Sequence, residues 1–408
     1  MLSLAFDMNM IMNMRPARTV VVLITLLPLL NLHRSCVDAF AITPMIDVPN
    51  AVTYPAAFIA AFRTGAAISV INQPRMPSID PSVSVGSTVL RLPSHGTRVR
   101  LFYPASKDNN TTSAIMAPYC TDGRQTSDGM AGLVGFRQLG LSFLLGHLAD
   151  ACSGCIQDAS ITQNNDDANL PLLIYSHGYG GNMDMATYFM RTMASKGMII
   201  AAIEHTDGTA SSTVLEDGYE RRFNEYLMTG RQQLTRRASE LLEAAEIIPK
   251  ELEKHYNATV GTVMLGGHSY GAPSAIMAAN GASESANIRG VLLHDPALGM
   301  GYGMLPPNGA KSKIPTISYI SDEYNRANVR YGDLTIHVKG CYHGGFVDAP
   351  LWAPGLIMRS LSLVIPAAGP ADPLMVHNQL AESAIAFMKS RDSASEEVMA
   401  GALFERVR

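Results

Sequence analysis

The stretch that decides the fold is TVMLGGHSYGAPSA, residues 262–275. A short apolar run leads directly into GGHSYG, and small and apolar residues follow. Gly267, Ser269 and Gly271 form G-x-S-x-G, the pattern of a sharp strand-to-helix turn that presents a serine hydroxyl at the top of a sheet. The flanking positions need glycine because side chains there would collide with the neighbouring strand and helix. The pattern predicts a strained Ser269 followed by a helix (residues 274–280) whose N-terminal N–H groups face a developing negative charge.

The composition is that of a globular protein with a substantial core. Of 408 residues, 47% are hydrophobic and only 16% are charged, and the length suits one large domain or two ordinary ones. The net charge is −4 with no long basic run, so we expect no nucleic-acid partner. Cys152 and Cys155 have C-x-x-C spacing, but no second pair or histidine cluster accompanies them. We therefore predict no metal and no cofactor, and leave open a local disulfide or two free thiols.

The N-terminus has the pattern of a targeting segment, which we place at residues 1–39. Arg15 and Arg18 precede an apolar stretch, residues 19–32, that is too short to cross a bilayer comfortably and ends near small residues. We expect it to direct the chain into the endoplasmic reticulum for secretion, with an uncleaved anchor as an alternative. The motif DAFA (residues 38–41) resembles the cleavage site of bipartite plastid presequences, so a plastid destination stays open. Residues 40–82 then form a linker or a transit-peptide-like region.

The catalytic domain is predicted over residues 83–390, with residues 391–408 as a C-terminal tail. Apolar runs at 171–175 and 198–203 predict buried strands, and residues 188–196 and 220–246 predict helices. The arginines of the second helix are expected on a solvated face. Alternation of strands and helices indicates a mostly parallel central sheet with helices on both faces.

Residues 129–149 are rich in large apolar side chains, from Leu133 to Leu145, with Gly135, Gly140 and Gly146 interspersed. We expect a helix that is apolar around most of its circumference. Such a helix packs over the core or lies on a lipid surface, and both interpretations stay open.

A glycine-rich loop and two acids follow the predicted strands. The loop SHGYGG (residues 176–181) leaves the N–H of Tyr179 available to hold a carbonyl oxygen, whereas its histidine is expected to be structural. Asp295 follows the strand 290–293 and Asp322 follows the strand 314–320, and His343 comes after the last predicted strand, 335–338. Because catalytic groups gather at the carboxyl ends of such strands, His343 is the natural base, with Asp295 or Asp322 as its acid.

Four motifs in this order carry a family resemblance: SHGYGG (176–181), AAIEHTDGTASS (201–212), GGHSYG (266–271) and GCYHGGFVD (340–348). They resemble the platelet-activating factor acetylhydrolases of the plasma and intracellular type II group, which are α/β-hydrolases. The resemblance extends from about Val85 through the last helix. The turn around Ser269 departs from the family's common pattern at Tyr270 and at Gly271-Ala272. These departures bear on which acyl chains and headgroups the protein prefers.

The resemblance implies a site and a substrate. Ser269 would be the nucleophile, His343 the base and Asp295 the acid, with Asp322 as the second candidate. The backbone N–H groups of Tyr179 and Tyr270 would form the oxyanion hole. The family cleaves the sn-2 ester of phospholipids with short or oxidised acyl chains, without calcium, and contacts lipid surfaces through apolar helices, one of them in residues 129–149.

The sequence thus predicts a serine ester hydrolase that resembles 1-alkyl-2-acetylglycerophosphocholine esterase and acts on a phospholipid through an acyl-enzyme. One alternative is a general carboxylesterase or another plastid or secreted ester hydrolase. An alternative of a different class is a non-catalytic, lipid-binding homologue with the same fold.

Overall fold

The computed structural model describes residues 76–80, 82–106, 115–137, 140–162, 169–223, 227, 229–310, 312–352, 369–390 and 395–407. The predicted targeting segment (1–39) and most of the 40–82 region lie outside the described residues.

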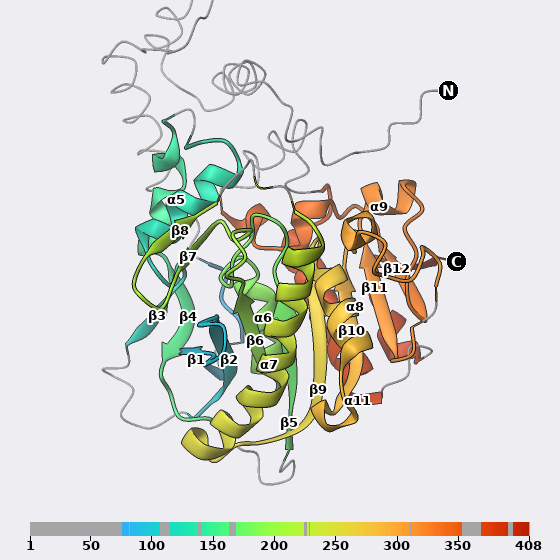
Figure 1. Cartoon of the computed structure of the whole chain (residues 1–408), viewed down its shortest axis with the longest axis horizontal. Helices are drawn as coiled ribbons and strands as arrows, with labels where there is room; N and C mark the ends of the chain where they lie inside the picture. The colour runs from blue at the N-terminus through green and yellow to red at the C-terminus, as the bar shows by residue number, and fades with distance from the viewer. Residues whose placement is uncertain are drawn as a thin grey trace, which may run out of the picture.

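An 11-stranded sheet forms the centre of the molecule, in the order β13-β12-β11-β10-β9-β5-β6-β2-β1-β4-β3 (Figure 1). Its strands are β1 (Ser84–Arg91), β2 (Arg98–Ala105), β3 (Met116–Pro118), β4 (Cys152–Gln157), β5 (Asn169–Ser176), β6 (Ile199–Glu204), β9 (Thr259–His268), β10 (Ile288–His294), β11 (Thr316–Ile320), β12 (Leu334–Val338) and β13 (Phe404–Val407). A separate hairpin joins β7 (Ser212–Val214) and β8 (Glu220–Arg222).

The six strands from β12 to β6 in this order run parallel, whereas β2 pairs with β6 in the antiparallel sense. Successive side chains of β5 alternate between the two faces: Leu172 and Ile174 join one buried cluster, and Leu173 and Tyr175 join the other. Both faces are therefore buried, as a parallel sheet requires. The predicted mostly parallel α/β architecture is confirmed.

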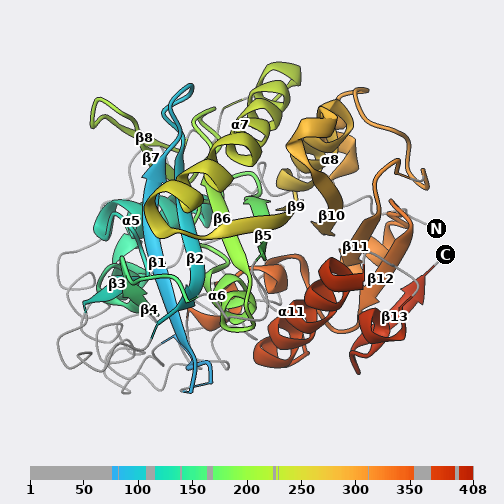
Figure 2. The same cartoon turned by 90° about the horizontal axis from the view of Figure 1, so that it is seen from below.

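Helices cover both faces of the sheet (Figure 2). One face carries α7 (Arg231–Tyr256) and α8 (Gly271–Gly281), and the other carries α6 (Thr187–Ser195) and α11 (Pro373–Ser390). The long α7 buries Leu234, Leu241 and Ile248 at intervals of seven residues, which lie on one side of a helix. Through this packing, α7 covers one face of the sheet.

Residues 129–149 do not form the single helix predicted for them. The helix α5 (Arg124–Leu133) ends early, and two short 3-10 turns follow, η3 (Ser142–Leu144) and η4 (Gly146–Asp150). Gly135 and Gly140 have φ values of 79° and 70°, a left-handed conformation that ends a helix. Met130, Ala131, Leu145 and Leu148 are buried in the core, and the apolar side chains between them are half-buried where they are described.

Two other boundaries differ from the prediction. Residues 220–222 form the strand β8 and α7 begins only at Arg231, after Gly230, so the predicted helix 220–246 is displaced toward the C-terminus. The predicted tail, residues 391–408, contributes β13, which pairs antiparallel to β12 at the edge of the sheet. Its four-residue strand is too short to stand out from the sequence pattern.

Within the part of the chain that the structure describes, no helix combines the length and the apolar character needed to span a membrane.

Candidate active site

Ser269 lies at the turn between β9 and α8. Its φ of 55° is a strained, left-handed value for a residue other than glycine, and its side chain is almost fully buried. A Cβ on Gly271 would lie 2.0 Å from the carbonyl oxygen of Ser176, and one on Gly267 would lie 2.3 Å from the backbone of Gly271. Glycine is therefore required on both sides of the serine, for the steric reason that the sequence pattern implied.

Asp295 and His343 are in direct contact at the carboxyl ends of β10 and β12. Asp295 Oδ2 lies 2.8 Å from His343 Nδ1, and Asp295 Oδ1 accepts a hydrogen bond from the backbone N–H of Ser321 at 2.7 Å. Asp295 is fully buried, whereas a quarter of the His343 side chain is exposed. The carboxylate thus holds Nδ1 of His343 by a hydrogen bond, and Nε2 lies on the opposite side of the ring.

Asp322, the alternative acid, has a different partner. Its Oδ1 lies 2.8 Å from Nε2 of His337, a residue of β12, and also accepts a bond from the N–H of Gly340 at 3.1 Å. The structure brings Asp295, and not Asp322, to His343.

Tyr324 links the imidazole to the serine. It belongs to α9 (Asp322–Arg326), and its ring stacks on that of His343 with 5.2 Å between centroids and an interplanar angle of 3°. Its hydroxyl lies near the side chain of Ser269. On the opposite side, the ring of His268 lies 4.6 Å from that of His343. One aromatic side chain therefore touches both Ser269 and His343, which places the two groups at one site.

The glycine loop after β5 lies against the serine. A Cβ on Gly178 would lie 3.0 Å from the Cβ of Ser269, so the backbone that precedes Tyr179 lies directly against the turn at Ser269. Tyr270 is the N-cap of α8, and the first N–H groups of a helix have no acceptor within the helix. The two residues predicted to donate to an oxyanion, Tyr179 and Tyr270, therefore lie on the two segments that meet at Ser269.

A buried arginine holds this loop in place. Arg237 of α7 is fully buried, with Nη1 2.6 Å from the carbonyl oxygen of His177 and Nε 3.0 Å from Asp207 Oδ2. Its guanidinium lies 4.7 Å from the ring centroid of Tyr270. We predicted this arginine on a solvated face, but it is buried and joins the loop 176–181 to the turn at Ser269.

A second set of a serine, a histidine and a carboxylate lies where the loop 176–181 begins. Ser176 Oγ is 2.7 Å from His205 Nε2, and His205 Nδ1 is 2.6 Å from Glu240 Oε2. All three side chains are fully buried. Burial, together with the charge of Arg237, lowers the pKa of His205, so its neutral ring bridges the serine and the glutamate. Its neighbour His177 is also buried with a lowered pKa and bonds to the backbone, in the structural role expected for it.

Asp348 anchors the loop that carries His343. Its carboxylate accepts bonds from the N–H of Tyr188 and the hydroxyl of Tyr119, both at 3.1 Å. Burial raises the pKa of Asp348 to about 7. No sequence pattern indicates this role, or the roles of Tyr324 and Arg237, because each depends on contacts between distant segments.

Among the described residues, no group of three or more histidine, cysteine or acidic side chains has a geometry suited to a metal ion. Cys152 and Cys155 are free thiols.

The sequence matches known proteins of one family. A family model described as platelet-activating factor acetylhydrolase, isoform II, matches residues 68–253. This stretch includes the glycine-rich loop 176–181 and ends before Ser269. The platelet-activating factor acetylhydrolase of Bos taurus is 30% identical over 161 residues, 38% of this chain and 34% of that protein. The matched stretch thus spans about a third of the length of the bovine relative. The Cavia porcellus acetylhydrolase is 24% identical over 367 residues, 79% of each chain.

Among solved structures, a ferulic acid esterase from Streptomyces cinnamoneus superposes with a TM-score of 0.55 and 16% identity, over 82% of this chain and 99% of that one. This likeness shows the fold. With its mostly parallel sheet and strand–serine–helix turn, the chain has an α/β-hydrolase fold, and over residues 68–253 it is similar to the platelet-activating factor acetylhydrolase family.

Proposed function

We propose that the protein is a serine-dependent ester hydrolase that cleaves short or oxidised sn-2 acyl groups from phospholipids. The observation that carries the proposal is the buried Asp295 bonded to Nδ1 of His343, beside a serine in a strained turn. These three groups supply the nucleophile, base and orienting acid of acyl transfer. The similarity to platelet-activating factor acetylhydrolases supports an ester substrate, and the phospholipid is the more specific part of the proposal.

In the first step, His343 Nε2 takes the proton of Ser269 as Oγ attacks the ester carbonyl. The N–H groups of Tyr179 and Tyr270 then hold the oxyanion of the tetrahedral intermediate. The intermediate collapses and expels the lysophospholipid alcohol, which receives the proton from His343. Asp295 keeps the imidazole in the tautomer with a proton on Nδ1 and stabilises the imidazolium.

In the second step, His343 takes a proton from water, and the resulting nucleophile attacks the acyl-enzyme. Collapse of the second intermediate returns the proton to Ser269 and releases the fatty acid. No step requires a metal ion, so the proposed activity persists in the presence of a calcium chelator.

A hydrolysis panel tests the proposal. Phospholipids with acetyl, oxidised and long sn-2 chains are compared with p-nitrophenyl esters, using wild type and Ser269→Ala. We expect a preference for the short and oxidised phospholipids, and loss of all turnover in Ser269→Ala. Ready turnover of soluble esters without a phospholipid preference indicates a general carboxylesterase instead. A wild-type protein that does not react with a fluorophosphonate probe indicates a non-catalytic homologue.

Two further parts of the proposal concern place. We propose that the N-terminal segment directs the chain into the secretory route, with a plastid destination as the alternative. Imaging of a C-terminal fluorescent fusion distinguishes the two destinations.

We also propose that the half-buried apolar side chains at 129–149, such as Leu133 and Phe136, contact lipid surfaces. Phe136→Ser is then expected to reduce sedimentation with phospholipid vesicles without loss of activity on soluble esters.

A further inference from the structure

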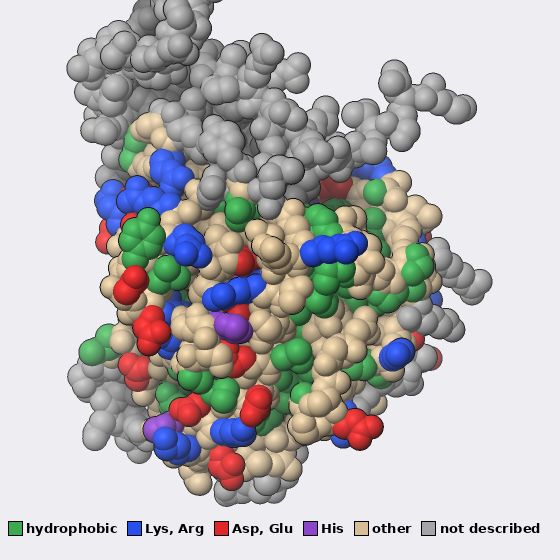
Figure 3. Space-filling model, viewed as in Figure 1, with side chains coloured by type: hydrophobic (Ala, Val, Ile, Leu, Met, Phe, Trp, Pro, Cys, Tyr) green, Lys and Arg blue, Asp and Glu red, His purple; other side chains and the backbone are tan. Residues whose placement is uncertain are grey.

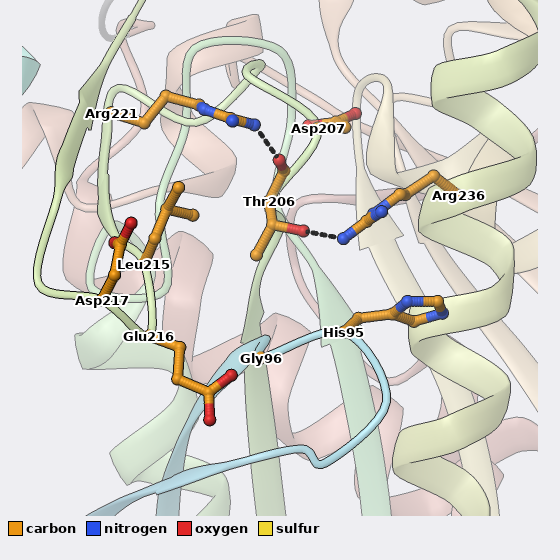
Figure 4. Close-up of a pocket in the computed structure, with 9 residues that line it drawn as sticks. All are labelled: His95, Gly96, Thr206, Asp207, Leu215, Glu216, Asp217, Arg221 and Arg236. Carbon is orange, nitrogen blue, oxygen red and sulfur yellow. Dashed lines mark hydrogen bonds between the residues drawn. The ribbon is translucent and has the colours of Figure 1, made fainter.

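A cavity separate from the serine site lies at the same edge of the sheet (Figure 4). It is formed by the turn between β1 and β2, the loop after β6, the β7–β8 hairpin and α7, and its volume is about 480 Å³. Arg98, the first residue of β2, pairs with Glu204, the last residue of β6, so the β1–β2 turn lies at the carboxyl ends of the parallel strands. The cavity has the size of a small-molecule site.

Two arginines converge in this cavity on one residue. Arg221 Nη1 donates to the carbonyl oxygen of Thr206 at 2.6 Å, and Arg236 Nη2 donates to Thr206 Oγ1 at 2.7 Å. Figure 4 shows that they approach Thr206 from opposite sides. A guanidinium carries five N–H donors, so each arginine keeps donors beyond those that Thr206 uses. Thr206 thus holds two guanidinium groups beside a common space.

Arg236 is paired with a carboxylate, whereas Arg221 is not. Glu240, which also accepts from His205 and Thr206, lies 3.3 Å from Arg236 Nε. Asp207 accepts from Arg237 and from Thr209. Among the described residues, no carboxylate lies within ion-pair distance of Arg221. Arg221 therefore brings unpaired positive charge to the cavity, and Arg236 keeps N–H donors that Thr206 and Glu240 do not use.

The cavity also carries negative charge. Glu216 and Asp217, in the turn of the same β7–β8 hairpin that supplies Arg221, are both exposed and line the cavity. Figure 3 shows charged side chains of both signs intermingled on the face of the molecule that carries α7. A cavity lined by both cations and acids suits a ligand with an anionic and a cationic end.

We propose that this cavity binds a phosphoryl oxyanion between Arg221 and Arg236. Two guanidinium forks match the oxygens of a phosphate group, which arginine binds through pairs of parallel hydrogen bonds. The source of the phosphoryl group is free phosphate or the phosphodiester of a zwitterionic headgroup whose cationic end lies beside Glu216. The headgroup source rests on the proposed function, whereas phosphate binding does not.

Isothermal titration calorimetry of the full chain at low ionic strength tests the site, with inorganic phosphate in one arm and glycerophosphocholine in the other. We expect saturable binding, weakened about ten-fold or more by Arg221→Gln and by Arg236→Gln, because each removes a charge-assisted contact. Arg222→Gln is the matched control, since Arg222 is the next residue on β8, is largely exposed and pairs with Glu220. Its affinity is expected to stay within about two-fold of wild type.

The variant Glu216→Gln separates the two sources. Weaker binding of glycerophosphocholine with unchanged or tighter binding of phosphate supports the headgroup, and equal behaviour of both ligands supports free phosphate. The proposal is overturned if millimolar phosphate gives no saturable heat, or if both arginine variants bind as wild type does. Thermal melting checks that each variant folds. If Arg236→Gln does not fold, Arg236→Lys takes its place, because lysine keeps the positive charge but lacks the paired N–H donors of a guanidinium. Neither ligand carries an acyl ester, so a protein without esterase activity gives the same binding result.

Discussion

Replacement of Asp295 by asparagine tests the proposed acid at a single atom. Asp295 Oδ1 is held by the N–H of Ser321 at 2.7 Å, which is a donor and so keeps an oxygen at that position. The asparagine NH₂ must then face Nδ1 of His343, where the carboxylate oxygen stood at 2.8 Å. Two donors cannot face each other, so the imidazole adopts the tautomer with its proton on Nε2 and cannot accept the proton of Ser269.

The expected loss follows from that tautomer. The same acid-to-amide change in a serine-protease triad lowers kcat by about 10⁴, which corresponds to roughly 5 kcal/mol of transition-state stabilisation. We expect a loss of similar size for Asp295→Asn, measured by steady-state hydrolysis of p-nitrophenyl acetate. Thermal melting should show a folded protein, because asparagine has nearly the shape of aspartate.

Asp322→Asn is the control, since Asp322 has a comparable position after the next strand and pairs with His337 instead. Its kcat should stay within a few-fold of wild type, and its cost should appear as a loss of about 1–2 kcal/mol in the free energy of unfolding. Equal loss of kcat in both variants, or a larger loss in Asp322→Asn, refutes the assignment of Asp295.

Three further predictions follow from the same geometry. Gly271→Ala forces a methyl group into backbone and should lower the free energy of unfolding by about 1–3 kcal/mol in urea denaturation, whereas Gly281→Ala, with open space around it, should change it by less than about 1 kcal/mol. Tyr324→Phe keeps the stacked ring and removes the hydroxyl near Ser269, so kcat/KM for a p-nitrophenyl ester should fall about three- to ten-fold at unchanged melting temperature. Asp348 has a folded-state pKa raised from 3.8 to about 7, so its stabilising contribution is complete below pH 4 and is lost as the pH rises toward 7. Denaturation curves between these pH values should show a fall of up to about 4 kcal/mol that is absent in Asp348→Asn; parallel curves for the two proteins would contradict it.

The sequence predicts this fold well where short motifs and strong periodicity coincide. The buried strands at 171–175 and 198–203 and the turn at Ser269 all appear close to their predicted places, because continuous apolar runs and paired glycines have few alternative structures. The order of Ser269, Asp295 and His343 also follows from the topology, which gathers the ends of parallel strands at one edge.

What the sequence could not predict depends on contacts between distant segments. Five arginines between 221 and 237 look alike in the sequence, yet Arg237 is fully buried against the oxyanion loop and Arg222 is largely exposed. The helix expected at 129–149 is interrupted at Gly135 and Gly140, which adopt a left-handed conformation that the apolar pattern does not reveal. The choice between Asp295 and Asp322 likewise needed the register of three strands.

The buried set of Ser176, His205 and Glu240 shows why hydrogen-bond geometry alone does not make a catalytic site. Ser176, His205 and Glu240 are joined by bonds of 2.7 and 2.6 Å, which is as good as the contact between Asp295 and His343. All three are fully buried, so no ester carbonyl can reach the serine, and their bonds instead fix the end of β5 where the oxyanion loop begins. His343 keeps a quarter of its side chain exposed, and only there can a substrate and a water molecule approach the base. Access to the base, together with the strained turn that presents Ser269, therefore distinguishes the proposed catalytic set from its buried counterpart.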